Sequence, residues 1–497
     1  MNTNIVHIDE VLEDKQSTLA YGHFSTIHPG HIRYLKHAKQ LGGKLIIALI
    51  GKISENKKIF EYSQQERSEA LILLSLGDLV VLLNTDELST AIQKISPKIL
   101  VLGNEFKESN EKSVNEAIKI QRSYRRQVIF HSGDIQYAST DLLVSTGEQI
   151  LRRRREEFRN ACKRNGLTKT KLINSINSWR SSNIVVIGDT IVDQYAACEA
   201  IGMSAEAPVV VVKELETKNF IGGAGIVASH IKALGADCHF ISVVGKDEIS
   251  KTVEFELNKR NIKNSLFKDR SRPTTFKKRY LVENQKLFRV SRLEEHNLDK
   301  NIEDQIIDEI EKLAPNADGI VISDFVYGVV TKRILEKIVN LSKTHNLLIF
   351  GDVQCSSQVG SIAKLKEFSL LCPNEREARI ALQDKDSGLE ELSRKLIEHT
   401  SVKNLIMKLG SKGFIAYQSI NEKSQKNQPF PALCVNPIDV SGAGDALLAV
   451  MSVGMSSKQS VMISSAIACC VSCLAVENLG NQPIEKNALI DFIKDIL

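Results

Sequence analysis

Several features are scarce in this 497-residue sequence, and each absence excludes a class of protein. No apolar run reaches the roughly 18 residues that a membrane-spanning helix needs. The first ten residues contain no basic region followed by an apolar one, so we expect no secretory signal. Nine cysteines are too few for a disulfide scaffold in a chain of this length, and a cytoplasmic chain keeps them reduced.

The sequence also lacks a large excess of positive or negative charge. The sequence has 65 Lys and Arg against 60 Asp and Glu, a net charge of +5. This excess is too small for a dedicated nucleic-acid or membrane-surface binder. We therefore expect a soluble, cytoplasmic protein that binds neither membranes nor nucleic acid.

Short apolar runs alternate with helix-length segments along most of the chain, which is typical of a parallel α/β sheet. The length fits two or three domains of roughly one to two hundred residues each. The runs predict strands at 44–49, 79–83, 99–102 and 128–131, and again at 183–188, 240–245, 319–323, 347–352 and 404–409. We expect two α/β domains, at 1–150 and 183–497.

The composition changes between these domains. Residues 151–182 contain ten Lys or Arg and only two acidic residues, Glu156 and Glu157. We interpret 151–182 as a solvated, partly helical linker. The alternative, a nucleic-acid-binding arm, more often carries interleaved aromatic residues. The single tryptophan, Trp179, is expected to pack against a domain.

The first candidate site is the segment His28-Pro29-Gly30-His31, followed by apolar residues at helical spacing. Two histidines three apart at a helix start share one face, where N–H groups and the helix dipole favour phosphate. Gly30 lets a triphosphate approach the backbone, and imidazolium groups stabilise charge that develops at an α-phosphate. For a lone pair of this kind, structural or surface histidines or metal ligands would be the more common explanation.

The surrounding residues extend this motif. Gly22-x-Phe24 precedes it, and Tyr137-Ala138-Ser139-Thr140 lies further along. Over about 20–143 the chain resembles the HxGH nucleotidyltransferase superfamily. The resemblance implies a Rossmann-like domain that uses ATP or CTP, with His28 and His31 catalytic. It also implies a nucleotide-binding set, namely Gly22, Phe24, Gly30, Arg67, Ser139 and Thr140.

The second candidate site is Asp439-Val440-Ser441-Gly442-Ala443-Gly444-Asp445, ahead of a helix of small and apolar residues. Three small residues at a helix start form an anion hole for a transferring phosphate, and Asp445 beside it can act as a base. Alone, such a turn is an ordinary loop.

Other motifs follow the order of the ribokinase family of carbohydrate kinases over 183–497, and the chain resembles that family there. They are Asp189-x-x-x-Asp193, Gly222-Gly223-Ala224-Gly225, Asn374-x-x-Glu377 and Lys408-Leu409-Gly410-Ser411-Lys412-Gly413. The resemblance implies an ATP-dependent kinase with Asp445 as base and Gly442, Ala443 and Gly444 as anion hole. It implies a sugar side made of Asp193, Gly222, Gly223 and Arg289, and a nucleotide and Mg²⁺ side made of Asn374, Glu377, Lys408, Gly410 and Gly413. The Mg²⁺ is then not held by a direct cage of protein ligands.

Together the two domains resemble the bifunctional heptose-phosphate kinase and heptose 1-phosphate nucleotidyltransferase family, which makes ADP-heptose for lipopolysaccharide, with the domain order reversed. The resemblance implies substrates that are sugar phosphates and nucleoside triphosphates, and a homodimer. Three departures from the usual motifs are Ser25 in the first domain, and Ile226 and Tyr327 in the second. They support an alternative, in which one or both domains are catalytically silent binding or sensing modules.

A Cys-x-x-Cys pair, Cys470 and Cys473, lies in a run of small residues near the C-terminus. No second pair or nearby histidine completes a zinc site. We interpret these cysteines as small buried helix residues.

Overall fold

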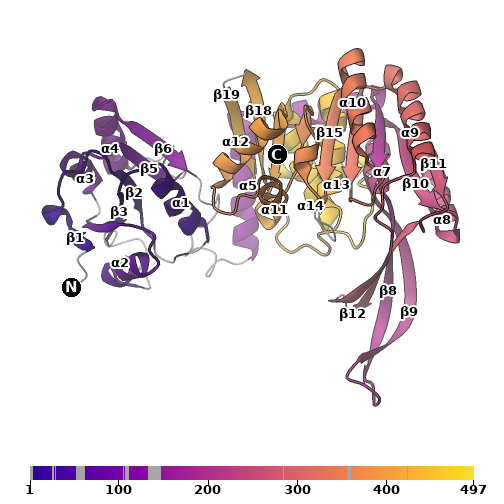
Figure 1. The fold of residues 1–497 in the computed structure, drawn as a ribbon, viewed down its shortest axis with the longest axis horizontal. Coiled ribbons are helices and arrows are strands. Elements are labelled where there is room, and N and C mark those ends of the chain that lie inside the picture. The colour runs from indigo at the N-terminus through magenta and orange to yellow at the C-terminus, as the bar shows by residue number, and fades with distance from the viewer. Residues whose placement is uncertain are drawn as a thin grey trace. The chain divides into compact units, whose positions relative to one another are not determined.

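The computed structural model describes residues 4–24, 27, 29–51, 62–84, 86–103, 106, 111–131, 147–283, 285–354, 360–421 and 424–497. The chain forms two compact units (Figure 1). One comprises residues 1–145 and 383–395, and the other comprises 146–382 and 396–497. Among the described residues, no helix is both long and apolar enough to cross a membrane.

The first unit contains a six-stranded sheet in which all neighbouring strands are parallel, as the sequence predicted. The strand order is β1-β4-β3-β2-β5-β6. The order reverses between β2 and β5, so the carboxyl ends of these two strands form the position at which doubly wound sheets bind ligands. The bounds are β1 (Ile5–His7), β2 (Thr18–Gly22), β3 (Leu45–Ile50), β4 (Leu79–Leu83), β5 (Ile99–Gly103) and β6 (Gln127–His131).

Helices cover both faces of this sheet because its central strands are apolar on both sides. Ile46 of β3 packs with apolar residues of α3 (Leu88–Ile95) and α4 (Lys112–Ser123). The next residue, Ile47, packs on the opposite face with residues of α1 (Pro29–Gln40) and α2 (Gln64–Leu73). The buried strand therefore supports two hydrophobic cores.

The second unit is built on a nine-stranded sheet of order β11-β10-β7-β14-β15-β16-β17-β18-β19. All pairs are parallel except β17–β18 and β18–β19. Its strands are β7 (Asn183–Gly188), β10 (Asp237–Gly245), β11 (Lys263–Asp269), β14 (Gly319–Asp324), β15 (Leu348–Val353), β16 (Leu370–Leu371), β17 (Asn404–Lys408), β18 (Phe414–Asn421) and β19 (Ser424–Phe430). The strands predicted at 183–188, 240–245, 319–323, 347–352 and 404–409 are all present.

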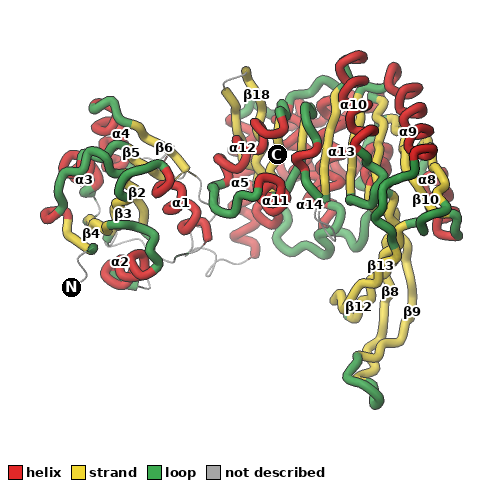
Figure 2. The backbone as a smooth tube through the Cα atoms, in the orientation of Figure 1, coloured by secondary structure: helices red, strands yellow, loops and turns green. Residues whose placement is uncertain are grey.

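This sheet is also buried on both faces, as the red helices beside its yellow strands in Figure 2 show. Val321 of β14 lies in the largest hydrophobic core, whereas its fully buried neighbours Ile320 and Ile322 point to the other face. The helices of this part of the chain are α7 (Ala224–Ala233), α8 (Glu248–Lys259), α9 (Lys300–Leu313), α10 (Lys332–His345), α11 (Glu375–Leu382), α12 (Leu389–Thr400), α13 (Ala443–Ser456), α14 (Val461–Val476) and α15 (Lys486–Ile496).

A second sheet, which we call the lid, projects from the nine-stranded sheet (Figure 1). It has the order β13-β12-β8-β9, with β12 parallel to β8 and the other two pairs antiparallel. Its strands are β8 (Thr190–Met203), β9 (Val210–Gly223), β12 (Thr275–Val282) and β13 (Gln285–Arg292). Every residue of β13 is exposed, so the lid has an uncovered side.

The segment predicted as a solvated linker, 151–182, is helical but is not solvated throughout. It forms most of α5 (Gly147–Arg164) and all of α6 (Lys169–Ser178), and its apolar side chains belong to the large core of the second unit. Phe158, Leu172 and Trp179 are fully buried. Trp179 thus packs against a domain, as predicted. The prediction followed the many Arg and Lys of this segment and overlooked the apolar residues that recur among them at helical spacing.

Removal of these helices should therefore damage the second unit. A fragment starting at 147 should melt cooperatively, whereas one starting at 183 should melt at a lower temperature, because it exposes the core that α5 and α6 cover. In the longer fragment, Trp179→Ala should lower the free energy of unfolding by about 3–5 kcal/mol. Urea denaturation of both fragments measures this. Phe255→Ala, at an exposed position, is the matched control and should change the free energy of unfolding little. Equal stability of the two fragments would contradict the packing of α5 and α6 on the core.

Candidate active sites

The start of α13 is shaped to receive an anion. Gly442 precedes the helix at a φ of +83°, a region that favours glycine. At Gly444, a Cβ would lie only 3.3 Å from Lys408 Nζ. The small residues 442–444 therefore leave the first N–H groups of α13 open, which suits a phosphate.

Asp445 follows in the first turn of α13 and is almost fully buried. Burial, together with the negative charges of the nearby Asp352 and Asp193, raises the pKa of Asp445 to about 8. The positive charge of Lys408 and a hydrogen bond from Gln354 act in the opposite direction. Gln354 Nε2 donates to Asp445 Oδ1 over 2.8 Å. A carboxylate with a raised pKa beside an anion hole is well suited to accept a proton.

A buried ion pair adjoins the anion hole. Lys408 Nζ lies 2.6 Å from Asp352 Oδ2, and Asp352 Oδ1 has no hydrogen-bond partner among the described residues. Burial disfavours the charged form of Lys408, but the attraction of Asp352 and Glu377 outweighs it and raises the lysine pKa. The lysine therefore stays positively charged beside the first turn of α13.

Asn374 and Glu377 form a reciprocal cap at the start of α11. The Asn374 N–H donates to Glu377 Oε2, and the Glu377 N–H donates to Asn374 Oδ1, both over 2.8 Å. This fixes both side chains on the wall of a cavity of about 520 Å³, whose lining also includes Lys408, Gly442, Ala443, Gly444 and Asp445. The predicted turn residues Gly410 and Gly413 line it too, as do apolar residues such as Phe414 and Leu433. A polar phosphate end and an apolar end fit a nucleotide.

The lid and the C-terminal loop contribute the other side of the site. Asp193 of β8 forms an ion pair with Arg279 of β12, and Asn481 Nδ2 donates to Asp193 Oδ2 over 3.3 Å. Gly222 and Gly223 end β9 opposite the start of β8. Arg289 of β13 pairs in register with Arg279. The residues predicted for the sugar side are thus brought together along the lid.

Asp439 connects the lid to the anion-hole loop. Its carboxylate accepts hydrogen bonds from Lys286 of β13 (2.8 Å) and from the Tyr195 hydroxyl of β8 (2.7 Å). It also accepts from the N–H groups of Ser441 and Gly480. Burial opposes its ionisation, but these bonds outweigh it and lower the pKa of Asp439 to about 2.

Sequence reasoning missed several of these side chains, among them Gln354, Arg279, Lys286 and Asn481. One signal was available for Gln354, which follows the strand-end residue Asp352 by two positions. The other three become recognisable only through their partners, which lie more than 80 residues away in the chain. The departure Ile226 is fully buried in α7.

The candidate transferase site lies after β2. Phe24 has a φ of +44°, and its ring meets that of His31 edge-on, with 5.1 Å between centroids. Pro29 and Gly30 form the start of α1, and His31 is half-buried in its first turn. A histidine thus stands at a helix start at the switch point of the sheet, where an anion is favoured.

Arg67 lies behind this site and is buried. Its guanidinium donates to the carbonyl oxygens of His23 and Ile50, which follow β2 and end β3. Ser63 caps α2 and so fixes the helix that carries Arg67. Three predicted residues, His28, Ser139 and Thr140, lie outside the described residues, as does Ser25.

The cysteines of the Cys-x-x-Cys pair are buried in α14, as predicted. Within the part of the chain that the structure describes, no group of three or more His, Cys, Asp or Glu could hold a metal ion.

A doubly wound sheet with a histidine at its switch point, followed by a lidded α/β unit with a buried aspartate at an anion hole, defines a chain with two phosphate-handling units. The model of the pfkB family of carbohydrate kinases matches residues 181–487, more than half of the chain, and the protein belongs to that family. A cytidylyltransferase-like model matches residues 19–195.

Curated relatives are named as bifunctional proteins. Bifunctional protein HldE of Campylobacter jejuni subsp. doylei is 29% identical over 327 residues, covering 64% of this chain and 67% of the relative. Bifunctional protein HldE of Pelobacter propionicus is 28% identical over 328 residues, covering 65% and 66%. The chain thus spans about two thirds of the length of these relatives.

Solved structures support the fold of the second unit. Phosphofructokinase-2 from Escherichia coli, in complex with substrates and products, aligns with a TM-score of 0.53 at 14% identity over 63% of this chain and 99% of that one. Ribokinase from Giardia lamblia aligns with a TM-score of 0.52 at 18% identity over 63% and 100%.

The raised pKa of Asp445 predicts a pH dependence of the kinase. A base must be ionised to accept a proton, so kcat/KM for the acceptor should fall about tenfold per pH unit below pH 8. Gln354→Leu removes a hydrogen bond that favours the ionised form, and it should move the inflection to higher pH. Initial rates between pH 5.5 and 9.5 measure both. A flat wild-type profile, or an inflection near pH 4, would contradict the assignment.

Proposed function

We propose that the protein is a bifunctional sugar-activating enzyme. Its second unit phosphorylates a sugar phosphate of the heptose 7-phosphate type with MgATP. Its first unit transfers a nucleotidyl group from ATP or CTP to a sugar 1-phosphate, giving a nucleotide sugar of the ADP-heptose type and pyrophosphate. The observation that carries the proposal is the buried Asp445 at the open first turn of α13, in a chain that also has a cytidylyltransferase-like region.

In the kinase unit, Asp445 accepts the proton of the acceptor hydroxyl. The hydroxyl oxygen bonds to the γ-phosphorus of ATP, and the bond from that phosphorus to the bridging oxygen breaks, releasing ADP. The N–H groups of residues 442–444 and the ammonium of Lys408 stabilise the charge on the transferred group. Gly410 and Gly413 contact the nucleotide.

Mg²⁺ is the metal that suits this cavity. The oxygens of Asn374 and Glu377 on the cavity wall are hard ligands, as is the Asp352 oxygen that has no partner among the described residues, and the Asp352 carboxylate lies near Gly444 of the anion hole. We infer that these residues hold the ion, directly or through water, together with the nucleotide phosphates. When bound, the ion neutralises phosphate charge.

In the transferase unit, His28 and His31 donate to the charge that develops as pyrophosphate leaves. The phosphate oxygen of the acceptor bonds to the α-phosphorus, and the bond from that phosphorus to the pyrophosphate oxygen breaks. Gly22, Phe24, Gly30, Ser139 and Thr140 contact the nucleotide. Arg67 fixes the carboxyl ends of β2 and β3, from which these contacts start.

The alternative of silent modules is not favoured. The family match and the intact Asp445 and anion hole support an active kinase, and the departure Ile226 is a core residue. Relatives that are named bifunctional support activity in both units.

Two variants should separate the activities. With MgATP and a panel of sugar phosphates, Asp445→Asn should lower ADP formation at least a hundredfold, because it removes the base but keeps the shape. Pyrophosphate release should persist in Asp445→Asn. His31→Ala should lower pyrophosphate release by about two to three decades, the typical effect of losing one transition-state donor, with ADP formation unchanged. Each variant is thus the control for the other, and a wild-type protein that releases neither product would favour the silent alternative.

The lid also supports a homodimer. Phe288 and Val290 of β13 lie on its outer face, opposite to Arg279 and Arg289, and are about half-exposed. Phe288 stacks on Tyr280 at 4.7 Å between centroids. Exposed apolar side chains that lie together on a sheet surface are typical of a protein–protein contact. We infer that a second copy covers this face.

Phe288→Glu should therefore convert the dimer to a monomer, because it places a charge in an apolar contact. Light scattering on a sizing column measures the mass. Phe255→Glu, at an exposed position in α8, should leave the dimer intact. A wild-type monomer, or a dimer that both variants keep, would contradict the inference.

A further inference from the structure

Lys277, in the middle of β12, is a buried lysine that has no counter-charge among the described residues. Only 3% of its surface is exposed. Its ammonium group forms no hydrogen bond or ion pair with any residue that the structure describes. Its neighbours differ: Lys278 lies 2.6 Å from Glu214, and Arg279 pairs with Asp193. A buried charge without a partner is costly, so Lys277 requires an explanation.

The surroundings of Lys277 offer aromatic rings and one further donor. Its Nζ lies 5.1 Å from the ring centroid of Tyr327 and 5.7 Å from that of Phe325, which compensates part of the charge. Tyr327 is only 2% exposed, and its hydroxyl has no partner among the described residues. Two donors for which the described residues supply no acceptor therefore lie close together.

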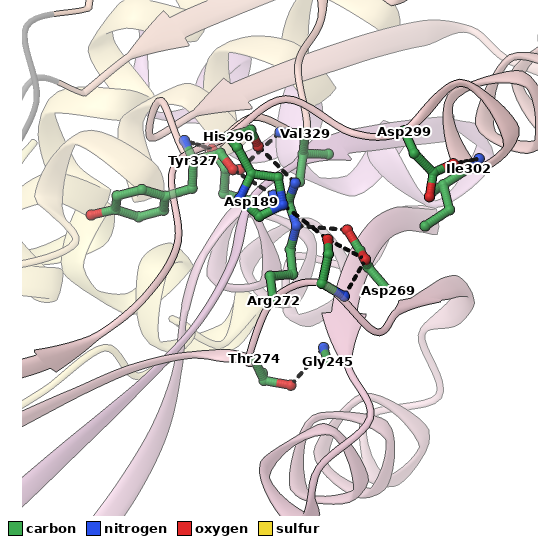
Figure 3. Close-up of polar contacts among 11 residues, drawn as sticks. Asp189, Gly245, Asp269, Arg272, Thr274, His296, Asp299, Ile302, Tyr327 and Val329 are labelled. Carbon is green, nitrogen blue, oxygen red and sulfur yellow. Dashed lines mark hydrogen bonds and ion pairs between the residues drawn. The ribbon is translucent and has the colours of Figure 1, made fainter.

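The loop that carries Tyr327 is held rigidly. Asp189 accepts hydrogen bonds from the N–H groups of Phe325 (2.7 Å), Tyr327 and Val329 (3.4 Å each). Arg272 donates to the Tyr327 carbonyl oxygen over 2.7 Å. Figure 3 shows that the Tyr327 ring points away from this polar cluster. The backbone contacts thus fix the loop and leave the hydroxyl uncommitted.

Lys277 lies beside the acceptor side of the kinase site. It pairs in register with Asp193 on the parallel strand β8, so both side chains leave the same face of the lid, about 5 Å apart at the backbone. Asp193 contacts Asn481 and lies near enough to Asp445 for their charges to interact. An acceptor whose hydroxyl reaches Asp445 can therefore place another group at Lys277.

We propose that Lys277 and the Tyr327 hydroxyl form an anion subsite that binds the phosphate group already present on the acceptor sugar. The ammonium and the hydroxyl both donate to phosphate oxygens, and the dianion supplies the missing counter-charge. The departure Tyr327 then supplies a hydrogen-bond donor to this subsite. This proposal rests on the proposed kinase function, and it names the residues that select a phosphorylated acceptor.

The test compares Lys277→Met with Lys278→Met in the full-length protein. Lys277→Met should raise the KM for a sugar phosphate at least thirtyfold, because a charge-assisted contact is lost, while the KM for ATP stays unchanged. Tyr327→Phe should raise the acceptor KM about tenfold. Lys278→Met alters the neighbouring residue on the opposite face of the strand and should leave both KM values near wild type.

A binding measurement that needs no turnover accompanies the kinetics. Inorganic phosphate should raise the melting temperature of the wild type and of Lys278→Met more than that of Lys277→Met, in which only the anion hole of α13 and the transferase site still bind it. Without phosphate, Lys277→Met should melt at or above the wild-type temperature, because it removes a buried unpaired charge. A lysine with a purely structural role would instead give a lower melting temperature.

The possible outcomes distinguish a failure of the anion subsite from a failure of the proposed kinase function. A Lys277→Met variant with wild-type KM for sugar phosphates and an unchanged phosphate response would overturn the subsite and leave the kinase function intact. If no sugar or sugar phosphate is phosphorylated, the proposed function fails, and the phosphate response alone decides on the subsite. A smaller response in Lys277→Met than in the wild type supports it, and equal responses overturn it.

Discussion

The second unit depends on charge that is kept out of water around the first turn of α13. Asp445 and Asp352 are buried there and Lys408 is largely shielded, although burial of an isolated ion is expensive. The ion pair between Lys408 and Asp352 satisfies two of the three charges. Asp445 receives only a neutral hydrogen bond from Gln354. Its pKa is therefore raised, and the residue is a stronger base than an exposed aspartate.

The lid likewise combines balanced and unbalanced charges, but its unbalanced charge is positive. Its inner face carries Lys277, Arg279 and Lys286, and the carboxylates of Asp193 and Asp439 balance the last two. For Lys277, the part of the chain that the structure describes supplies no carboxylate. The unit thus presents positive charge at two places, at the anion hole and at the lid, as an enzyme needs if it transfers a phosphoryl group to a molecule that is already phosphorylated.

Much of the fold could be predicted from local pattern, because buried parallel strands read as apolar runs. The runs at 79–83, 99–102 and 319–323 coincide with β4, β5 and β14 to within one residue. The linker could not be predicted in this way. Its arginines and lysines dominate the composition, but the stripe that includes Phe158 and Trp179 decides where it packs.

The residues of the candidate site also fall into two groups, those that a local sequence pattern indicates and those that it does not. Motifs that are contiguous in sequence, such as the turn before Asp445, indicate their helix start directly. Lys277, Gln354 and Asn481 stand in no such motif. Their significance arises from sheet register, burial and partners that are distant in the chain, none of which a single sequence displays.

The central claim is that one chain carries two distinct activities on sugar phosphates. Mass spectrometry of the products formed from mixed nucleoside triphosphates and a panel of sugar phosphates, including sugar 1-phosphates, tests it most directly. The account predicts two new species: a sugar that has gained one phosphate, and a nucleotide sugar formed together with pyrophosphate. A protein that yields only one of these species from the full panel, or neither, would contradict it.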